Sequence, residues 1–157
     1  MKGSVPSPCR LRPTRPGDAS AVAAIHCALF DRPWQRDCLQ RLLELPTVRA
    51  FIAEATTAQA LVGFILGQVA ADDAEILSIG VAPAWQRCGI AGLLIRAFTA
   101  SVSGAGAKRV LLEVAADNKP ALALYLRHGF HCVGRRKCYY EHRDAPFADA
   151  LVLAKGS

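Results

Sequence analysis

Hydrophobic and polar positions along this chain follow two different periods, one typical of strands and one typical of helices. Short apolar or alternating runs predict strands at residues 9–12, 48–55, 61–71, 75–81, 109–114, 130–140 and 149–154. Apolar side chains spaced three or four residues apart predict helices at residues 19–30, 35–45 and 91–102, and in a segment that opens at residues 117–120. This order makes a mixed α/β plan, with a central sheet of about seven strands flanked by about four helices.

Several boundaries and faces follow from single residues. Asp18 is a candidate N-cap for the first helix, and residues 145–147 are expected to form a turn before the last strand. Residues 1–8 are rich in Pro, Ser and Gly and predict a loose tail, so that residues 9–157 make one domain. In the second helix, four side chains are expected to point inward: Cys38, Leu39, Leu42 and Leu43.

Residues 79–94 are the stretch around which the chain is organised. A β-type run over residues 76–81 ends at Pro83, a glycine turn follows, and an apolar helical pattern continues from Leu93. A strand, a tight turn and a helix in this order direct unpaired backbone N–H groups and the positive end of the helix dipole toward an anion. The turn is neither a Walker loop nor the Gly-x-Gly-x-x-Gly of dinucleotide folds, and an ordinary strand-to-helix connection is the alternative.

The turn resembles the Arg/Gln-x-x-Gly-x-Gly/Ala signature of the GCN5-related N-acetyltransferases (GNAT), in which this loop holds the pyrophosphate of acetyl-CoA. The matching residues are Gln86, Arg87, Cys88, Gly89, Ile90 and Ala91. The resemblance implies the GNAT fold, with a splayed pair of parallel strands, and acetyl-CoA as cosubstrate. It assigns cofactor binding to the loop and to the backbone of the strand before it: Ile79, Gly80, Val81, Arg87, Cys88, Gly89, Ile90, Ala91 and Gly92.

Further stretches resemble the same family in the same order. They correspond to its fifth strand and following asparagine, to its Ala-x-x-Leu-Tyr-x-x-x-Gly-Phe helix end, and to motifs of the RimI-type branch, the ribosomal-protein-alanine N-acetyltransferases. That branch implies acetyl transfer to a protein N-terminal α-amine, with a ribosomal protein as the expected acceptor. The matching residues are 112–114 with Asn118, 123–130, 135–140, 149–153, and Phe30, Pro33 and Trp34.

The chain also departs from the family pattern at three positions. Gly80 replaces a usual alanine, Gly92 replaces a usual basic residue after the loop, and Leu153 stands where Met is common. None of these changes removes a group that the chemistry needs. Gly92, however, takes one charge away from the expected pyrophosphate site.

Acetyl transfer to an amine needs a base for the attacking ammonium and an acid for the leaving thiolate. Glu113, a lone carboxylate near the end of a buried apolar strand, is the candidate base by resemblance and by chemistry, and Glu75 on the neighbouring strand is the second choice. A structural pairing of Glu113 with Arg109, Lys108 or another cation is the alternative. Tyr125 is the candidate acid, with core packing as its alternative.

Other polar and aromatic residues are candidates for binding. The resemblance implies that Asn118 bonds the arm of CoA, although capping of the following helix is an equally natural role. Glu75, Trp34, Tyr139 and Tyr140 are the candidate substrate-binding residues. The two tyrosines suit strand packing equally well.

Composition narrows the function further. Of 157 residues, 52% are hydrophobic and 20% charged, which excludes disorder. The net charge of +6 suits an acidic ligand such as a nucleotide cofactor, whereas scattered arginines and 7% aromatic residues give no sign of direct nucleic-acid readout. Six cysteines without a Cys-x-x-Cys pair indicate reduced thiols and no metal site. Without a membrane-spanning run or a signal core, a cytoplasmic monomer or weak homodimer is expected.

Three alternatives to acetylation of a protein N-terminus stay open. In the first alternative, the acceptor of the acetyl group is a small amine, an antibiotic or a lysine side chain. A second alternative is a CoA-binding module without catalysis. The third is a nucleic-acid-binding protein, for which tight and salt-sensitive RNA binding would be the mark.

Overall fold

The computed structural model describes residues 8–142 and 145–156, and of residues 138–142 and 145–147 it describes the backbone alone. The predicted tail therefore lies outside the described residues, except for Pro8. Four α-helices are described: α1 (Ala19–Leu29), α2 (Arg36–Glu44), α3 (Ile90–Gly104) and α4 (Lys119–Arg127), with short 3-10 helices at Pro16–Asp18 and Pro83–Trp85. Seven strands are described: β1 (Cys9–Pro13), β2 (Val48–Ala55), β3 (Leu61–Ala70), β4 (Asp73–Val81), β5 (Arg109–Ala115), β6 (His131–His142) and β7 (Ala145–Gly156).

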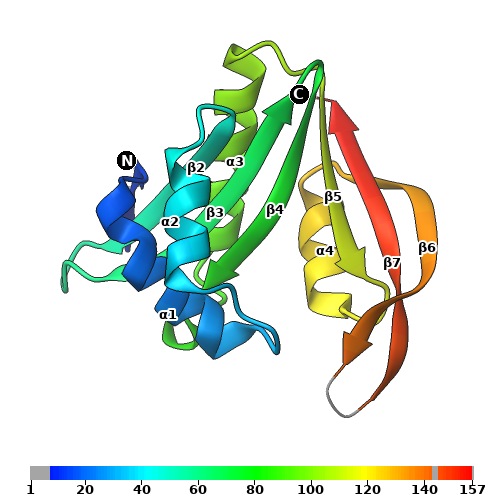
Figure 1. The fold of residues 1–157 in the computed structure, drawn as a ribbon, viewed down its shortest axis with the longest axis horizontal. Coiled ribbons are helices and arrows are strands. Elements are labelled where there is room, and N and C mark those ends of the chain that lie inside the picture. The colour runs from blue at the N-terminus through cyan, green and yellow to red at the C-terminus, as the bar shows by residue number, and fades with distance from the viewer. Residues whose placement is uncertain (1–7, 143–144, 157) are drawn as a thin grey trace, which may run out of the picture.

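The described strands form one seven-stranded sheet in the order β1-β2-β3-β4-β5-β7-β6. β4 and β5 pair in parallel, and every other neighbouring pair in this sheet is antiparallel. The parallel pair is joined through α3, as a crossover connection requires. Figure 1 shows β4 and β5 side by side at one end and diverging toward the other. The sheet and its helices confirm the predicted mixed α/β fold with a splayed parallel pair.

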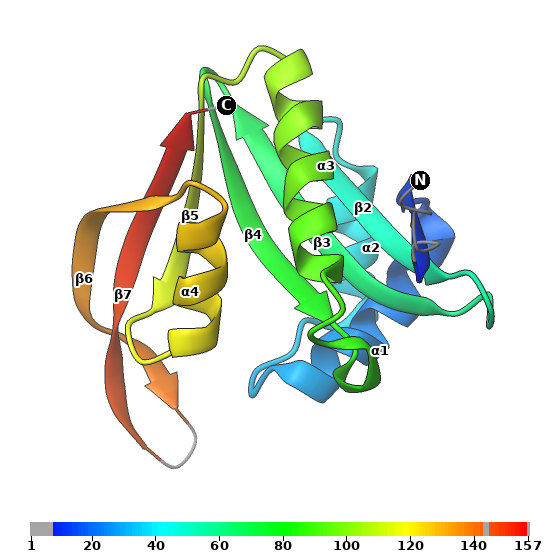
Figure 2. The same ribbon diagram turned by 180° about the vertical axis from the view of Figure 1, so that it is seen from behind.

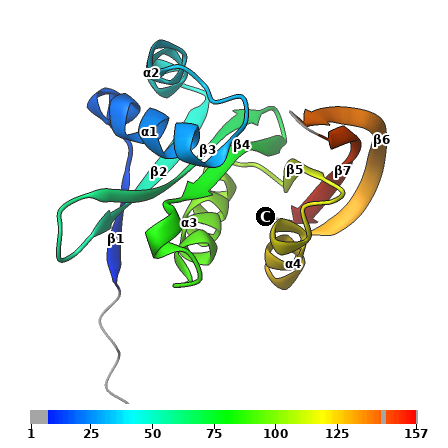
Figure 3. The ribbon, with the colours of Figure 1, turned by 90° about the horizontal axis from the view of Figure 1, so that it is seen from below.

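The helices cover both faces of the sheet. Figure 3 shows α1 and α2 on one face and α3 and α4 on the other. The larger hydrophobic cluster lies on the α3 and α4 face and includes Phe98 and Tyr125. The smaller cluster lies under α1 and α2, around Leu39 and Phe64. Side chains on opposite faces of β4 and β5 therefore enter two different environments.

Two local predictions are wrong. Residues 145–147, predicted as a turn, belong to β7, because strand pairing with β6 continues to the pair of Ala145 with His142. Cys38, predicted to point inward, is exposed. Leu39 is fully buried and, with the half-buried Leu42 and Leu43, already forms the inner stripe of α2, so Cys38 lies beyond the edge of that stripe.

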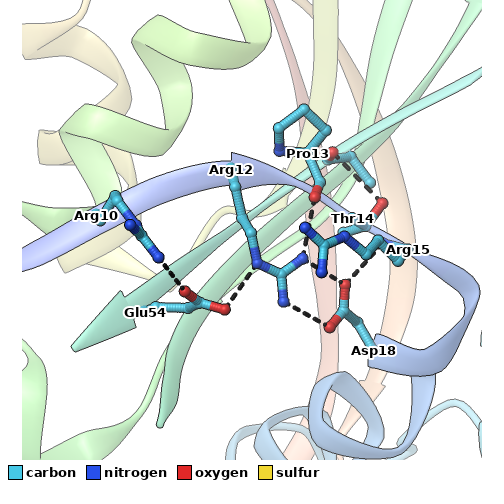
Figure 4. A network of polar contacts seen from close by, with 8 residues as sticks. Arg10, Arg12, Pro13, Thr14, Arg15, Asp18 and Glu54 are labelled. Carbon is cyan, nitrogen blue, oxygen red and sulfur yellow. Dashed lines mark hydrogen bonds and ion pairs between the residues drawn. The ribbon is translucent and has the colours of Figure 1, made fainter. Parts of the chain in front are cut away.

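Asp18 precedes α1 as predicted, but its carboxylate does not cap that helix. It accepts a hydrogen bond from the backbone N–H of Arg15 (2.7 Å) and two from the guanidinium of Arg12 (2.9 Å each). The same guanidinium donates to Glu54 on β2 through its Nε (2.7 Å), as Figure 4 shows. These charge-assisted hydrogen bonds hold the pKa of both carboxyls below their ordinary values. The network fastens β1 to β2 and to the start of α1.

Candidate active site

The gap between β4 and β5 begins in the middle of both strands. Residues 73–76 of β4 pair with residues 109–112 of β5, and the described ladder ends there. β4 continues to Val81 and β5 continues to Ala115. Figures 1 and 2 show that these two strands diverge toward the N-termini of α3 and α4. Strand edges that part in this way expose backbone N–H and C=O groups to a ligand.

The backbone of β4 is oriented toward this gap at two positions. The N–H of Ala82 donates to the carbonyl oxygen of Val62 on the β3 side, with an N···O distance of 2.8 Å. Because successive N–H groups of a strand point to opposite edges, those of Ile79 and Val81 point away from β3 and toward the gap. This is the direction that pairing with an extended ligand requires.

Gly80, between these two residues, serves packing. A Cβ at Gly80 would lie 2.9 Å from the Leu29 side chain and 2.9 Å from the Phe64 ring. The alanine that is usual at this position therefore does not fit here without a shift of α1 or β3. The departure from the family pattern is explained by close packing on the α1 and α2 face.

The turn after β4 is held by its own residues. Gln86 donates a side-chain hydrogen bond to the carbonyl oxygen of Val81 (3.0 Å), which ties the turn to the end of the strand. Arg87 and Gly89 have positive φ angles of 62° and 80°, a conformation that glycine adopts at little cost. The side chains of Arg87 and Cys88 are exposed. The turn thus presents a free backbone and one cation to solvent.

The first turn of α3 supplies the donors that the sequence predicts. Gly89 is the N-cap residue and, having no side chain, makes no capping bond to the N–H groups of Ile90, Ala91 and Gly92. The Ile90 side chain is buried in the core, so only its backbone faces the turn. Gly92 is buried because the imidazole of His128 lies over it. Uncapped N–H groups at the start of a helix are suited to an anion.

Glu113 projects from the face opposite to α3 and α4. Its neighbours Val110, Leu112 and Val114 all belong to the larger hydrophobic cluster, and alternation along a strand places Glu113 on the other side. Glu75 pairs with Leu111, the residue two before Glu113, so both candidate bases lie on the same face near the point where the strands part. The side chain of Glu113 is half-buried, whereas Glu75 is exposed.

The cation beside Glu113 is one that the sequence did not single out. Nη2 of Arg136 on β6 lies 3.1 Å from Oε1 of Glu113. The sequence analysis named Arg109, Lys108 or another cation as a structural partner of Glu113. Arg109 pairs with Asp73, the first residue of β4, and Lys108 pairs with Asp72 just before it, so the partner is another cation, as that alternative allowed. No local pattern indicates the Arg136 contact, because β7 lies between β5 and β6 in the sheet.

Tyr125 lies on α4 and is 7% exposed. Its ring meets that of Phe130 edge to face, with 5.8 Å between centroids, within the larger cluster. The candidate acid therefore lies on the α3 and α4 side of the sheet, and the candidate base lies on the opposite side. Such an arrangement allows one group to serve the thioester and the other to serve an incoming amine.

Two of the remaining candidates, Asn118 and Trp34, have visible structural roles. Oδ1 of Asn118 accepts a hydrogen bond from the N–H of Ala121 (3.3 Å) and caps α4, the alternative that the sequence left open. Trp34 lies in the connection from α1 to α2, where its backbone N–H donates to Nδ1 of His26 (3.1 Å). Tyr139 and Tyr140 are on β6, and their side chains lie outside the described part of the chain.

Two buried polar groups escaped the sequence analysis. His26 is 3% exposed, and its ring stacks on Phe30 at 4.3 Å and on Trp34 at 5.1 Å between centroids. Burial lowers its pKa from the ordinary value. Ser78, on β4 just beyond the ladder, is buried with no hydrogen-bond partner for its hydroxyl among the described residues. A histidine or serine in an apolar segment carries no distinguishing local signal.

Among the described residues, no three His, Cys, Asp or Glu side chains gather as a metal ion would need. No helix in the same part of the chain has the length and apolar character for crossing a membrane.

The chain is similar to known proteins in both sequence and structure. N-alpha-acetyltransferase RimI of Mycobacterium tuberculosis is 35% identical over 146 residues, 89% of this chain and 87% of that protein. The structure of the ribosomal-protein-S18-alanine N-acetyltransferase of Escherichia coli superposes with a TM-score of 0.86 and 25% identity, covering 94% of this chain and 93% of the other. Arabidopsis thaliana NAA60, solved with acetyl-CoA, has a TM-score of 0.82 and 23% identity, covering 94% and 98%.

These similarities confirm the resemblance inferred from the glycine turn and the stretches that follow it. A profile of the Acetyltransferase (GNAT) family matches residues 19–130, well over half of the chain. The chain therefore belongs to the GNAT family of acetyltransferases.

Proposed function

We propose that residues 9–157 form one acetyl-CoA-dependent N-acetyltransferase domain that acetylates the α-amine of a protein N-terminus, with a ribosomal protein as acceptor. The single observation that carries the proposal is the gap between β4 and β5, with the candidate base and the candidate acid on opposite faces of the sheet. The Mycobacterium tuberculosis relative is named as an N-alpha-acetyltransferase, and the Escherichia coli enzyme is named for an alanine of ribosomal protein S18. A ribosomal acceptor places the reaction in the cytoplasm.

The cosubstrate is held by backbone groups. The N–H groups of residues 90–92 and the Arg87 guanidinium bind the pyrophosphate at the start of α3. The pantetheine arm lies along β4, where Ile79 and Val81 present their N–H groups. The Val81 N–H donates to the thioester oxygen and stabilises the negative charge that develops there. Asn118 at the start of α4 reaches the arm while it caps the helix.

In the proposed reaction, the base acts from one face of the sheet and the acid acts from the other. Glu113, through a water molecule, accepts a proton from the N-terminal ammonium, and the free amine attacks the thioester carbonyl carbon. As the carbon–sulfur bond breaks, the acetyl group stays on nitrogen, the nitrogen releases its second proton to water, and the Tyr125 phenol protonates the leaving thiolate of CoA and is itself reprotonated from water. Glu75 is the alternative base. The amine reaches the gap from the face that carries Trp34 and the connection between α1 and α2, with Tyr139 and Tyr140 at its side.

A peptide experiment tests the proposal. The protein is incubated with acetyl-CoA and either a peptide with a free N-terminal alanine or the same peptide with a blocked N-terminus and an internal lysine. Mass spectrometry of the products is expected to find one acetyl group on the first peptide alone. Acetylation of the blocked peptide would assign the enzyme to lysine, and acetylation of polyamines or aminoglycosides alone would assign it to small amines. Binding of acetyl-CoA without transfer to any amine would reduce the chain to a binding module.

A second experiment addresses the acceptor in cells. N-termini are compared by mass spectrometry in cells with and without this protein. Loss of acetylation from a ribosomal protein N-terminus is the expected result. Unchanged ribosomal N-termini would contradict the proposed acceptor.

A further inference from the structure

His128 brings a titratable group to the first turn of α3 from the other half of the sheet. It follows the last residue of α4, and a Cβ at Gly92 would lie 2.8 Å from its Nε2 atom. Any residue larger than glycine at position 92 would displace this ring. The family pattern has a basic side chain at this position, so the imidazole stands where that side chain would begin.

The surroundings of His128 carry positive charge from three elements. Nη1 of Arg96 on α3 would lie 3.7 Å from a Cβ at Gly92, and Nζ of Lys155 on β7 donates to the His128 carbonyl oxygen at 2.9 Å. Arg127 is the residue before His128 at the end of α4. In the described part of the chain, none of these three cations forms a salt bridge with a carboxylate. A half-exposed cationic group without acidic partners suits an anionic ligand.

We propose that His128, with Arg96 and Lys155, binds a phosphate group of acetyl-CoA and supplies the positive charge that Gly92 lacks. The inference rests on the proposed function, since it deepens the cofactor site of the same reaction. His128 donates through Nε2 beside the N–H groups that open α3. Either the pyrophosphate or the 3′-phosphate of CoA offers the same chemistry, and the experiment separates them.

The electrostatics give this site a dependence on pH. In the free protein, burial lowers the pKa of His128, and Arg96, Lys155 and Arg127 lower it further. A bound phosphate favours the imidazolium and raises that pKa. Binding therefore takes up a proton, and the affinity for acetyl-CoA increases as the pH falls through the interval between the two pKa values.

Isothermal titration of acetyl-CoA between pH 6 and pH 8.5, in buffers of different ionisation enthalpy, tests the proposal. The variant is His128→Gln, which keeps a neutral donor of similar size. It is expected to bind acetyl-CoA about 10-fold more weakly than the parent protein at pH 6 and about equally at pH 8.5. Its proton uptake is expected to fall. The control is His131→Gln, because His131 is exposed on β6, and this variant is expected to match the parent protein.

The same titration with acetyl-dephospho-CoA, which lacks the 3′-phosphate, identifies the phosphate group that His128 binds. If the difference between the parent protein and His128→Gln persists with this compound, His128 binds the pyrophosphate, and if it disappears, His128 binds the 3′-phosphate. Identical pH dependence and proton uptake in the parent protein and His128→Gln would overturn the inference while the parent protein still binds acetyl-CoA. A parent protein that does not bind acetyl-CoA at all would overturn the proposed function as well.

A measurement without substitution covers the case in which His128→Gln is unstable. The His128 ring proton on Cε1 is followed by NMR over the same pH range, with and without CoA. A pKa that rises on binding supports the assignment. An unchanged pKa in the presence of saturating CoA contradicts it.

Discussion

Glu113 and Arg136 meet across an intervening strand, with Oε1 of the carboxylate 3.1 Å from Nη2 of the guanidinium. Glu113 is on β5 opposite Val152 of β7, and Arg136 is on β6 opposite Ala150 of the same strand. The Glu113 side chain is 19% exposed and that of Arg136 is 57% exposed. The pair therefore fixes a largely covered carboxylate beside the gap and leaves part of it exposed, where the proposed amine and its water approach.

Replacing Glu113 by Gln tests its role as base. Glu113→Gln is expected to lower kcat about 100-fold at neutral pH, because a neutral amide does not accept the proton of the ammonium. The Kd for acetyl-CoA, measured by titration, is expected to stay unchanged. The matched variants are Glu75→Gln, on the same face, and Glu44→Gln, exposed at the end of α2. Unchanged turnover in Glu113→Gln with a collapse in Glu75→Gln would transfer the role to Glu75.

Tyr125→Phe separates an acid from a packing residue. The ring stays against Phe130, so the melting temperature is expected to change little, whereas kcat is expected to fall by about 10- to 100-fold. Tyr125→Leu, which removes the ring from a site only 7% exposed, is expected to lower both. A normal rate together with a lower Tm in Tyr125→Phe would show that the phenol serves stability alone.

Gly89→Ala tests the turn that opens α3. A side chain at φ of 80° costs about 1 kcal/mol, and the turn relaxes away from the orientation in which its N–H groups converge. The Kd for acetyl-CoA is expected to rise about 10-fold. Gly104→Ala, at the last residue of α3 with open space around it, is the matched control and is expected to keep the parent Kd. Equal affinities in the two variants would place the anion elsewhere.

The stack around His26 predicts a dependence of stability on pH. Burial lowers the pKa of His26 below its ordinary 6.5, so the folded protein binds fewer protons than the unfolded chain. The free energy of unfolding is therefore highest above pH 6.5 and decreases as the pH falls below that value. In His26→Gln, urea denaturation is expected to show lower stability at pH 7.5 but a flatter profile down to pH 5. His131→Gln, in contrast, should keep the parent slope.

The Arg12 network predicts a second pH effect in a lower range. The pKa of Asp18 is lowered by its hydrogen bonds to Arg12, so this contribution to stability is complete above 3.8 and is lost as the pH falls below it. Asp18→Asn is expected to destabilise the protein by about 1–2 kcal/mol at pH 7 and much less at pH 3. Asp72→Asn breaks a pair whose side chains are 70% and 77% exposed, and should cost less than about 0.5 kcal/mol. Equal effects of the two substitutions would contradict the assignment.

The sequence predicted the order and type of the elements because hydrophobic periodicity is local. The run at residues 48–55 is strand β2 as predicted, and the turn at Gly89 opens a helix as predicted. The sequence did not predict the contacts between elements that are distant along the chain. The pairing of Arg136 with Glu113 depends on strand order, the ring of His128 over Gly92 depends on how α4 meets α3, and the missing cap at Asp18 depends on Arg12. Each is set by tertiary packing, to which a local pattern does not respond.

The four-residue ladder between β4 and β5 also has a consequence for cooperativity. The sheet is continuous through only residues 73–76 and 109–112, so the segment from β1 to β4 and the segment from β5 to β7 share few backbone hydrogen bonds. A ligand arm bonded to β4 would add to this seam and link the two segments mechanically. Amide hydrogen exchange at Ile79 and Val81 should then slow far more on saturation with acetyl-CoA than exchange in the outer strand β2.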